Sequence, residues 1–149
     1  IVEHMINYDV GKFNSLLDLG CGSGILSLLS VKMGVRKVLA IDVDHLCEEN
    51  FYKNASLNNI TDVQFLVQDV HQLKDYNYDV ILANIDKQNI IKIINKFEQC
   101  NFESILIISG FLYEDKDQVL DCLKKSYADK ILKKGEWGSM VIKRKSIEN

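Results

Sequence analysis

Short apolar runs alternate along the chain with stretches in which apolar side chains recur every three to four residues. A short run of this kind predicts a strand buried on both faces, and the wider spacing predicts a helix with one apolar face. The strand pattern fits residues 15–19, 37–41, 63–67, 78–83, 104–109, 130–134 and 140–143. The helical pattern fits residues 1–8, 24–33, a helix capped by Asp44, residues 87–100, and a helix carrying Val119, Leu120, Leu123 and Tyr127.

This alternation predicts an α/β fold with a doubly wound, mostly parallel seven-stranded sheet, whose last two strands form an antiparallel hairpin at one edge. No linker, repeat or low-complexity segment interrupts residues 1–149, so a single domain is expected. Ligands of such sheets bind beyond the carboxyl ends of the strands, near the point where the strand order reverses. The polar residues at those ends are therefore the candidates for function.

Composition excludes several classes of function. The net charge of −3 shows no basic surplus, so direct nucleic-acid binding is not expected. No apolar run is long enough to cross a bilayer, and no membrane association is predicted. The cysteines lack the paired spacing of a zinc or redox motif and the histidines are scattered, so no metal is predicted and a cytoplasmic protein with reduced thiols is expected. These residues are Cys21, Cys47, Cys100, Cys122, His4, His45 and His71.

The densest chemical signal is the segment SLLDLGCGSG at residues 15–24, in which a short apolar run leads into Asp18 and a helix follows the glycines. Glycines occupy alternate positions between them: Gly20, Gly22 and Gly24. Glycine permits positive φ and lets a ligand lie against a main chain without Cβ. The dinucleotide fingerprint fails, because Ile25 and Ser27 stand where a third glycine is needed, and no phosphate-binding Lys-Ser/Thr pair follows. A purely structural turn remains the alternative.

The remaining pattern, Asp-x-Gly-x-Gly-x-Gly, resembles motif I of the class I S-adenosylmethionine (AdoMet) methyltransferases. The resemblance implies that AdoMet is the cofactor and that Asp18 helps to hold its methionine ammonium. It also implies that the three glycines let the methionine and the sugar lie across the strand end. Cys21, between the first two glycines, belongs to the same implied cofactor-binding set, although it could simply fit a tight loop.

Acids end the next two predicted strands. Asp42 can accept both hydroxyls of a ribose, and the alternative of a helix cap is already filled by Asp44. Asp69 stands where the methyltransferase family uses an acid to accept the adenine amino group, although a role in a turn is equally open. Val43 and Val70 follow these acids and are candidates to sandwich the adenine, with ordinary buried aliphatic residues as the alternative.

Asn84 closes the fourth strand in Ala-Asn-Ile. Many methyltransferases that act on planar nitrogens of bases carry Asn/Asp-Pro-Pro-aromatic here, and this chain has no proline, so that chemistry is disfavoured. The blocks DLGCGSGIL, GVRKVLAIDVD, LANI, ISGFL and EW are similar, in order and spacing, to the catalytic domain of the ribosomal protein L11 methyltransferases. The resemblance implies methyl transfer to amines of a ribosomal protein, with Asn84 lining the cofactor and orienting the neutral amine.

The chain departs from that family in two respects. The family's recognition domain and cofactor cover would lie before Ile1, so residues 1–149 are expected to be the catalytic domain of a longer protein. Asp86-Lys87-Gln88 replaces the small or apolar residues that follow Ala-Asn-Ile, and Asp86 could attract a cationic amine or cap a helix. The alternative functions are a methyltransferase for a small molecule or RNA, and a non-catalytic AdoMet-binding module.

Overall fold

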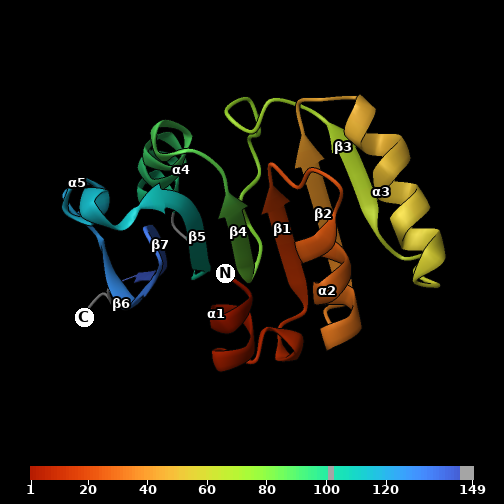
Figure 1. Cartoon of the computed structure of the whole chain (residues 1–149), viewed down its shortest axis with the longest axis horizontal. Helices are drawn as coiled ribbons and strands as arrows, with labels where there is room; N and C mark the ends of the chain where they lie inside the picture. The colour runs from red at the N-terminus through yellow and green to blue at the C-terminus, as the bar shows by residue number, and fades with distance from the viewer. Residues whose placement is uncertain (101–102, 145–149) are drawn as a thin grey trace.

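The computed structural model describes residues 1–100 and 103–144, and its strands form a single seven-stranded sheet in the order β3-β2-β1-β4-β5-β7-β6 (Figure 1). In chain order the elements are α1 (Val2–Asn7), η1 (Val10–Lys12), β1 (Ser15–Leu19), α2 (Ile25–Met33), β2 (Lys37–Asp42), α3 (Leu46–Leu57), β3 (Gln64–Val67), β4 (Val80–Asn84), α4 (Lys87–Gln99), β5 (Ile105–Leu112), η2 (Tyr113–Asp115), α5 (Lys116–Leu120), β6 (Ser126–Lys134) and β7 (Trp137–Arg144).

The five strands from β1 to β5 are mutually parallel, and β7 is antiparallel to both of its neighbours. The predicted doubly wound sheet with a closing hairpin is therefore confirmed. In Figure 1 the arrowheads of β1, β2 and β4 point to the upper edge, where the carboxyl ends of the parallel strands lie. The strand order reverses between β1 and β4, so the ends of these two strands form the centre of that edge.

Neighbouring residues of each central strand belong to different cores, as expected for a sheet covered on both faces. Leu16 packs with α1, α2 and α3 on one face, whereas Leu17 packs with α4 and α5 on the other. Ile81 and Leu82 repeat this division on β4, and all four side chains are fully buried. Burial of such a side chain contributes roughly 1.5–3 kcal/mol, so both faces stabilise the sheet that presents the site.

The predicted helix through Tyr127 is wrong. Helix α5 ends at Leu120, and Tyr127 lies in β6, where the residue is 41% exposed. Strand β6 begins at Ser126 and pairs with β7 along its length, apart from a bulge between Ala128 and Lys130. The apolar spacing suited a helix, but pairing with β7 satisfies the backbone of this segment in an extended conformation.

Helix α1 and the residue that follows it contact the hairpin formed by β6 and β7. The buried His4 Nε2 lies 3.0 Å from Ser139 Oγ on β7. The Tyr8 hydroxyl donates to Asp129 on β6, and Lys143 Nζ lies 2.7 Å from the same carboxylate. These contacts hold the first helix against the last strands.

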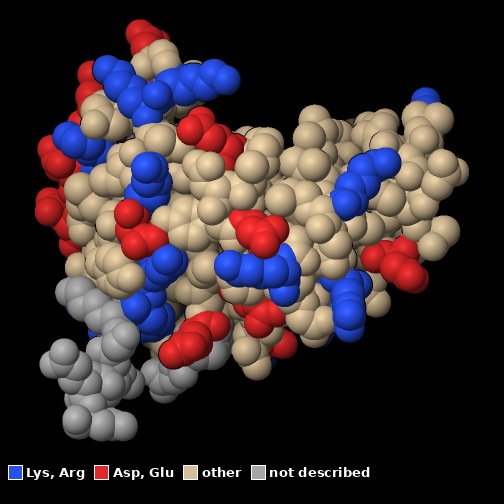
Figure 2. Space-filling view, turned by 90° about the horizontal axis from the view of Figure 1, so that it is seen from below, with Lys and Arg blue, Asp and Glu red and all other residues tan. Residues whose placement is uncertain are grey.

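Within residues 1–100 and 103–144, no helix combines the length and the apolar character needed to span a bilayer. Figure 2 views the edge opposite the carboxyl ends, where basic and acidic side chains are interspersed.

Candidate functional site

The sheet brings the glycine-rich loop and Asn84 together. Leu19 pairs with Ala83, so the residues that follow them, Gly20 and Asn84, lie side by side at the ends of β1 and β4. A Cβ on Gly20 would lie only 2.5 Å from Ile85 Cγ2, which shows how closely the two loops approach. The sequence prediction that these strand ends share one edge is confirmed.

The glycines of the loop have different surroundings. Gly24 has φ +86°, and a Cβ there would lie 2.3 Å from the Phe51 ring, so this glycine allows the start of α2 to pack on α3. Gly22 also has positive φ, +54°, but a Cβ there would meet no atom within 4 Å. The main chain at Gly22 is therefore open to a ligand, whereas the need for glycine at position 24 comes from packing.

Asp18 lies beneath this loop and is only 1% exposed. Its Oδ2 accepts the Ser27 hydroxyl at 2.5 Å. Burial raises the pKa of Asp18 from 3.8 to about 6, and the hydrogen bonds from Ser27 oppose that rise. A carboxylate in this position places negative charge close under the loop, where a cationic group would be attracted to it. Ser27, which in the sequence only excludes a dinucleotide fingerprint, is thus the residue of α2 that hydrogen-bonds Asp18.

Asp42 joins the end of β2 to the loop. Its Oδ2 accepts the Gly22 N–H at 2.8 Å and its Oδ1 accepts the Asp44 N–H at 3.0 Å. A carboxylate has about four acceptor positions, so each oxygen can accept one further hydrogen bond from a ligand hydroxyl. Asp44 in turn accepts the Leu46 N–H at 2.9 Å, but the N-cap residue of α3 is His45, so the predicted capping role of Asp44 is wrong by one residue.

The two valines behave differently. Val43 is 72% exposed at the end of β2, so the alternative of an ordinary buried aliphatic residue is wrong for this position. Val70 packs partly against the core next to α4, and its carbonyl accepts the Tyr76 hydroxyl at 2.9 Å. Asp69 Oδ1 accepts the His71 N–H at 2.8 Å, a turn contact that leaves the carboxylate half-buried.

Asn84 is exposed at the end of β4, paired with Ser109 of β5. Asp86 caps α4, because its Oδ1 accepts the Asn89 N–H at 3.1 Å, and the hydrogen bonds from Asn89 lower its pKa. The capping alternative for Asp86 is thereby confirmed. Cys21 is half-buried with its pKa raised by burial, so its thiol is neutral and is not a nucleophile at neutral pH.

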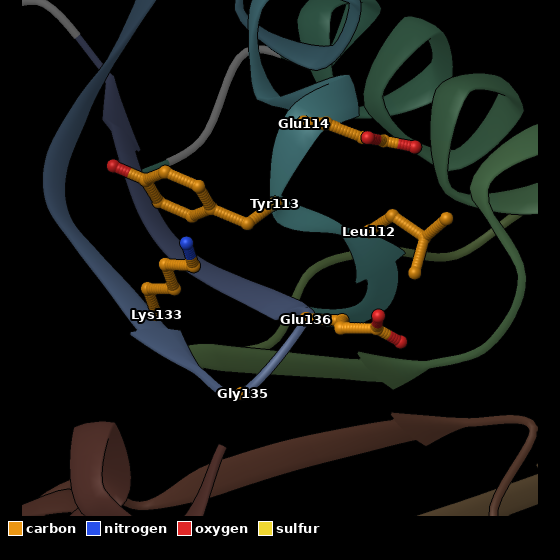
Figure 3. A pocket seen from close by; sticks show the side chains of 6 residues that line it. All are labelled: Leu112, Tyr113, Glu114, Lys133, Gly135 and Glu136. Carbon is orange, nitrogen blue, oxygen red and sulfur yellow. The ribbon is translucent and has the colours of Figure 1, made fainter.

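The same edge continues past Asn84 to the tip of the hairpin, where a hollow of about 250 Å³ opens (Figure 3). It is lined by Leu112, Tyr113, Glu114, Lys133, Gly135 and Glu136. Lys133 Nζ lies 5.1 Å from the centre of the Tyr113 ring, while the two acids lie on the other side. In the described part of the chain, no three His, Cys, Asp or Glu side chains are grouped as metal ligands.

Comparison with known proteins shows the family to which the chain belongs. Residues 3–145 match the family model described as ribosomal protein L11 methyltransferase (PrmA). The chain belongs to this family. The ribosomal protein L11 methyltransferase of Ruminiclostridium cellulolyticum is 34% identical over 135 residues, and that of Thermosipho melanesiensis is 37% identical over 131 residues.

These matches cover 86% of the chain but only 42% and 48% of the two relatives, so the chain spans less than half of their length. Among solved structures, the ribosomal protein L11 methylase of Lactobacillus delbrueckii subsp. bulgaricus has a TM-score of 0.86 and 25% identity, covering 97% of this chain and 78% of that one. Magnesium protoporphyrin IX methyltransferase of Synechocystis, with a TM-score of 0.74, 18% identity and coverage of 97% of this chain and 78% of its own, shares the fold.

Proposed function

We propose that this chain is the AdoMet-binding catalytic domain of a PrmA-family methyltransferase that transfers methyl groups to amines of ribosomal protein L11. The single observation that carries the proposal is the open main chain at Gly22, hydrogen-bonded to Asp42 in the loop that follows β1, where the strand order reverses. Family membership supports the choice of substrate. Ribosomes are cytoplasmic, so the proposal also assigns the protein to the cytoplasm.

The roles of the residues follow from their surroundings. Asp42 has free acceptor positions for the ribose hydroxyls, and the negative charge of Asp18 attracts the methionine ammonium. Val43 offers an exposed apolar side chain to one face of the adenine, while Val70 and Asp69 lie on the loop that follows β3. Gly20, Gly22, Gly24 and Cys21 form the loop against which the rest of the cofactor lies.

Bound AdoMet supplies an activated methyl group on its sulfonium, so the protein has to align the acceptor rather than activate the donor. A lysine amine has an ordinary pKa of about 10.4 and attacks only after losing its proton. The exposed Asn84 amide can accept a hydrogen bond from the neutral amine and thereby turn its lone pair toward the methyl group. Water can take the proton, so the mechanism requires no strong base from the chain.

Asp42→Ala, with Asp44→Ala as the matched control, tests cofactor binding. Loss of hydrogen bonds to a charged acceptor is expected to cost about 1.5–3 kcal/mol of affinity for S-adenosylhomocysteine, or roughly 10- to 150-fold. The control removes a neighbouring exposed acid that contacts only the start of α3. Equal loss in the two variants, measured by titration calorimetry, would contradict the ribose assignment.

Methyl transfer itself is tested with labelled AdoMet and three separate acceptors: L11, ribosomal RNA and a metabolite pool. Label in L11 alone supports the proposal. Label in RNA or a metabolite favours the alternative methyltransferases, and binding without any transfer favours the non-catalytic module. The recognition domain that the resemblance implies before Ile1 stays a prediction, tested by comparing this chain with a longer protein under single-turnover conditions.

A further inference from the structure

A chain of hydrogen bonds joins the loop after β3 to the first turn of α4. Asp69 Oδ1 accepts the His71 N–H at 2.8 Å, and His71 Nε2 lies 2.7 Å from Asn89 Oδ1. The Asn89 side-chain nitrogen donates to Asp86 Oδ2 at 2.5 Å, and its backbone N–H donates to Asp86 Oδ1. The chain thus begins beside the proposed adenine contacts and ends two residues after Asn84.

The chemistry of the partners sets the direction of each bond. The Asp86 carboxylate only accepts, so the Asn89 amide must present its nitrogen to it and its oxygen to His71. An amide oxygen also only accepts, which requires His71 to donate from Nε2. The buried Nδ1 of His71 has no partner among the described residues, so nothing competes for the orientation of the ring.

This contact is one of several that place a loop without regular secondary structure, and it links that loop to the first turn of α4. Residues 68–79 form neither helix nor strand between β3 and β4. Lys96 Nζ, from α4, donates to the His71 carbonyl, and Tyr76 donates to the Val70 carbonyl. Helix α4 therefore holds His71 both by its backbone and by its ring, and α4 begins three residues after Asn84, the last residue of β4.

We propose that His71 and Asn89 are positioning residues for methyl transfer, which hold the adenine-side loop in register with Asn84. The inference rests on the proposed function. In-line transfer requires the sulfonium and the amine to be fixed relative to each other, and small displacements are costly. The His71–Asn89 hydrogen bond fixes the loop after β3, which binds the adenine end of the cofactor, relative to Asn84, which orients the acceptor. Neither residue contacts the reacting atoms.

The test is a pair of double-mutant cycles on S-adenosylhomocysteine affinity, measured by calorimetry. His71→Phe removes the donor and is expected to weaken binding roughly five- to tenfold, whereas His71→Gln keeps an N–H donor and stays within about twofold of wild type. In an Asp69→Ala background, His71→Phe should lose most of its effect. In an Asp42→Ala background, His71→Phe should keep its full effect, because the Asp42 side chain shares no hydrogen bond with His71.

Kinetics separate positioning from simple loop support. With L11 as acceptor and AdoMet saturating, His71→Phe and Asn89→Leu are expected to lower kcat by at least about fivefold. Saturation with AdoMet fills the site but does not restore the position of the bound cofactor relative to Asn84. An unchanged kcat, an unchanged affinity, or equal effects of His71→Phe in both backgrounds would each overturn the inference. Absence of ligand binding by the wild-type protein would instead overturn the proposed function, and the inference with it.

Discussion

Replacing Asp18 by Asn is expected to raise the stability of the fold while weakening its affinity for the cofactor. The side chain is 1% exposed, and its burial raises its pKa from 3.8 to about 6. Each pKa unit corresponds to about 1.4 kcal/mol, so an ionised Asp18 costs the folded state about 3 kcal/mol relative to the unfolded chain. Because the pKa of Asp18 is higher in the folded state than in the unfolded chain, protonation of Asp18 favours the folded state. This contribution to the free energy of unfolding is complete below about pH 4 and is lost as the pH rises through about 6.

Urea unfolding of wild type and Asp18→Asn between pH 4 and pH 8 measures this cost. The difference in free energy of unfolding, variant minus wild type, should increase by about 3 kcal/mol across that range and then level off. Ser27→Ala removes a hydrogen bond that lowers the pKa of Asp18 in the folded state, so the increase should begin at the same pH but become larger and extend to higher pH. A difference that stays flat from pH 4 to pH 8 would refute the argument from burial.

The same variant tests the proposed attraction of Asp18 for the methionine ammonium. At pH 7.5, affinity for S-adenosylhomocysteine should fall roughly 10- to 100-fold, because a charge-assisted interaction of about 1.5–3 kcal/mol is lost. Affinity equal to that of wild type in calorimetry would remove Asp18 from the cofactor site. A more stable protein that binds its ligand less well would show that this carboxylate is retained at the expense of the fold.

Other variants have distinct expected effects. Asn84→Ala should lower turnover with L11 by at least tenfold, because one hydrogen bond to a charge-bearing transition state is lost. The affinity for S-adenosylhomocysteine, measured by calorimetry, should change little. Unchanged turnover would exclude Asn84 from the mechanism. Gly24→Ala, which collides with Phe51, should lower the free energy of unfolding by about 1–3 kcal/mol, whereas Gly22→Ala should chiefly weaken ligand binding. Burial lowers the pKa of His4 below 6.5, so the free energy of unfolding should decline as the pH falls below 6.5. In urea unfolding, His4→Gln should show a smaller decline than wild type. An identical decline in the two proteins would show that His4 is not its cause.

Local patterns in the sequence were sufficient to predict the sheet and the edge at which the candidate site residues lie. Strand β1 has the predicted bounds, and the acid-glycine spacing that follows it identifies the loop at the centre of the sheet. These predictions succeed because a run of apolar side chains on a parallel strand can be buried only between two helical layers, which forces the carboxyl ends to one edge. The antiparallel hairpin was likewise predicted, although β6 is longer than its apolar pattern indicated.

Contacts between distant residues decided the rest. The spacing through Tyr127 suits a helix, but pairing with β7 makes it a strand, since backbone hydrogen bonds to a neighbouring strand outweigh a weak local preference. His71 and Asn89 are 18 residues apart and match no motif, so their hydrogen bond has no signal in the sequence. The sequence placed Asp18 at a strand end, but only the packing of α2 over it determines its burial and its raised pKa, because desolvation depends on what surrounds a carboxyl group in space.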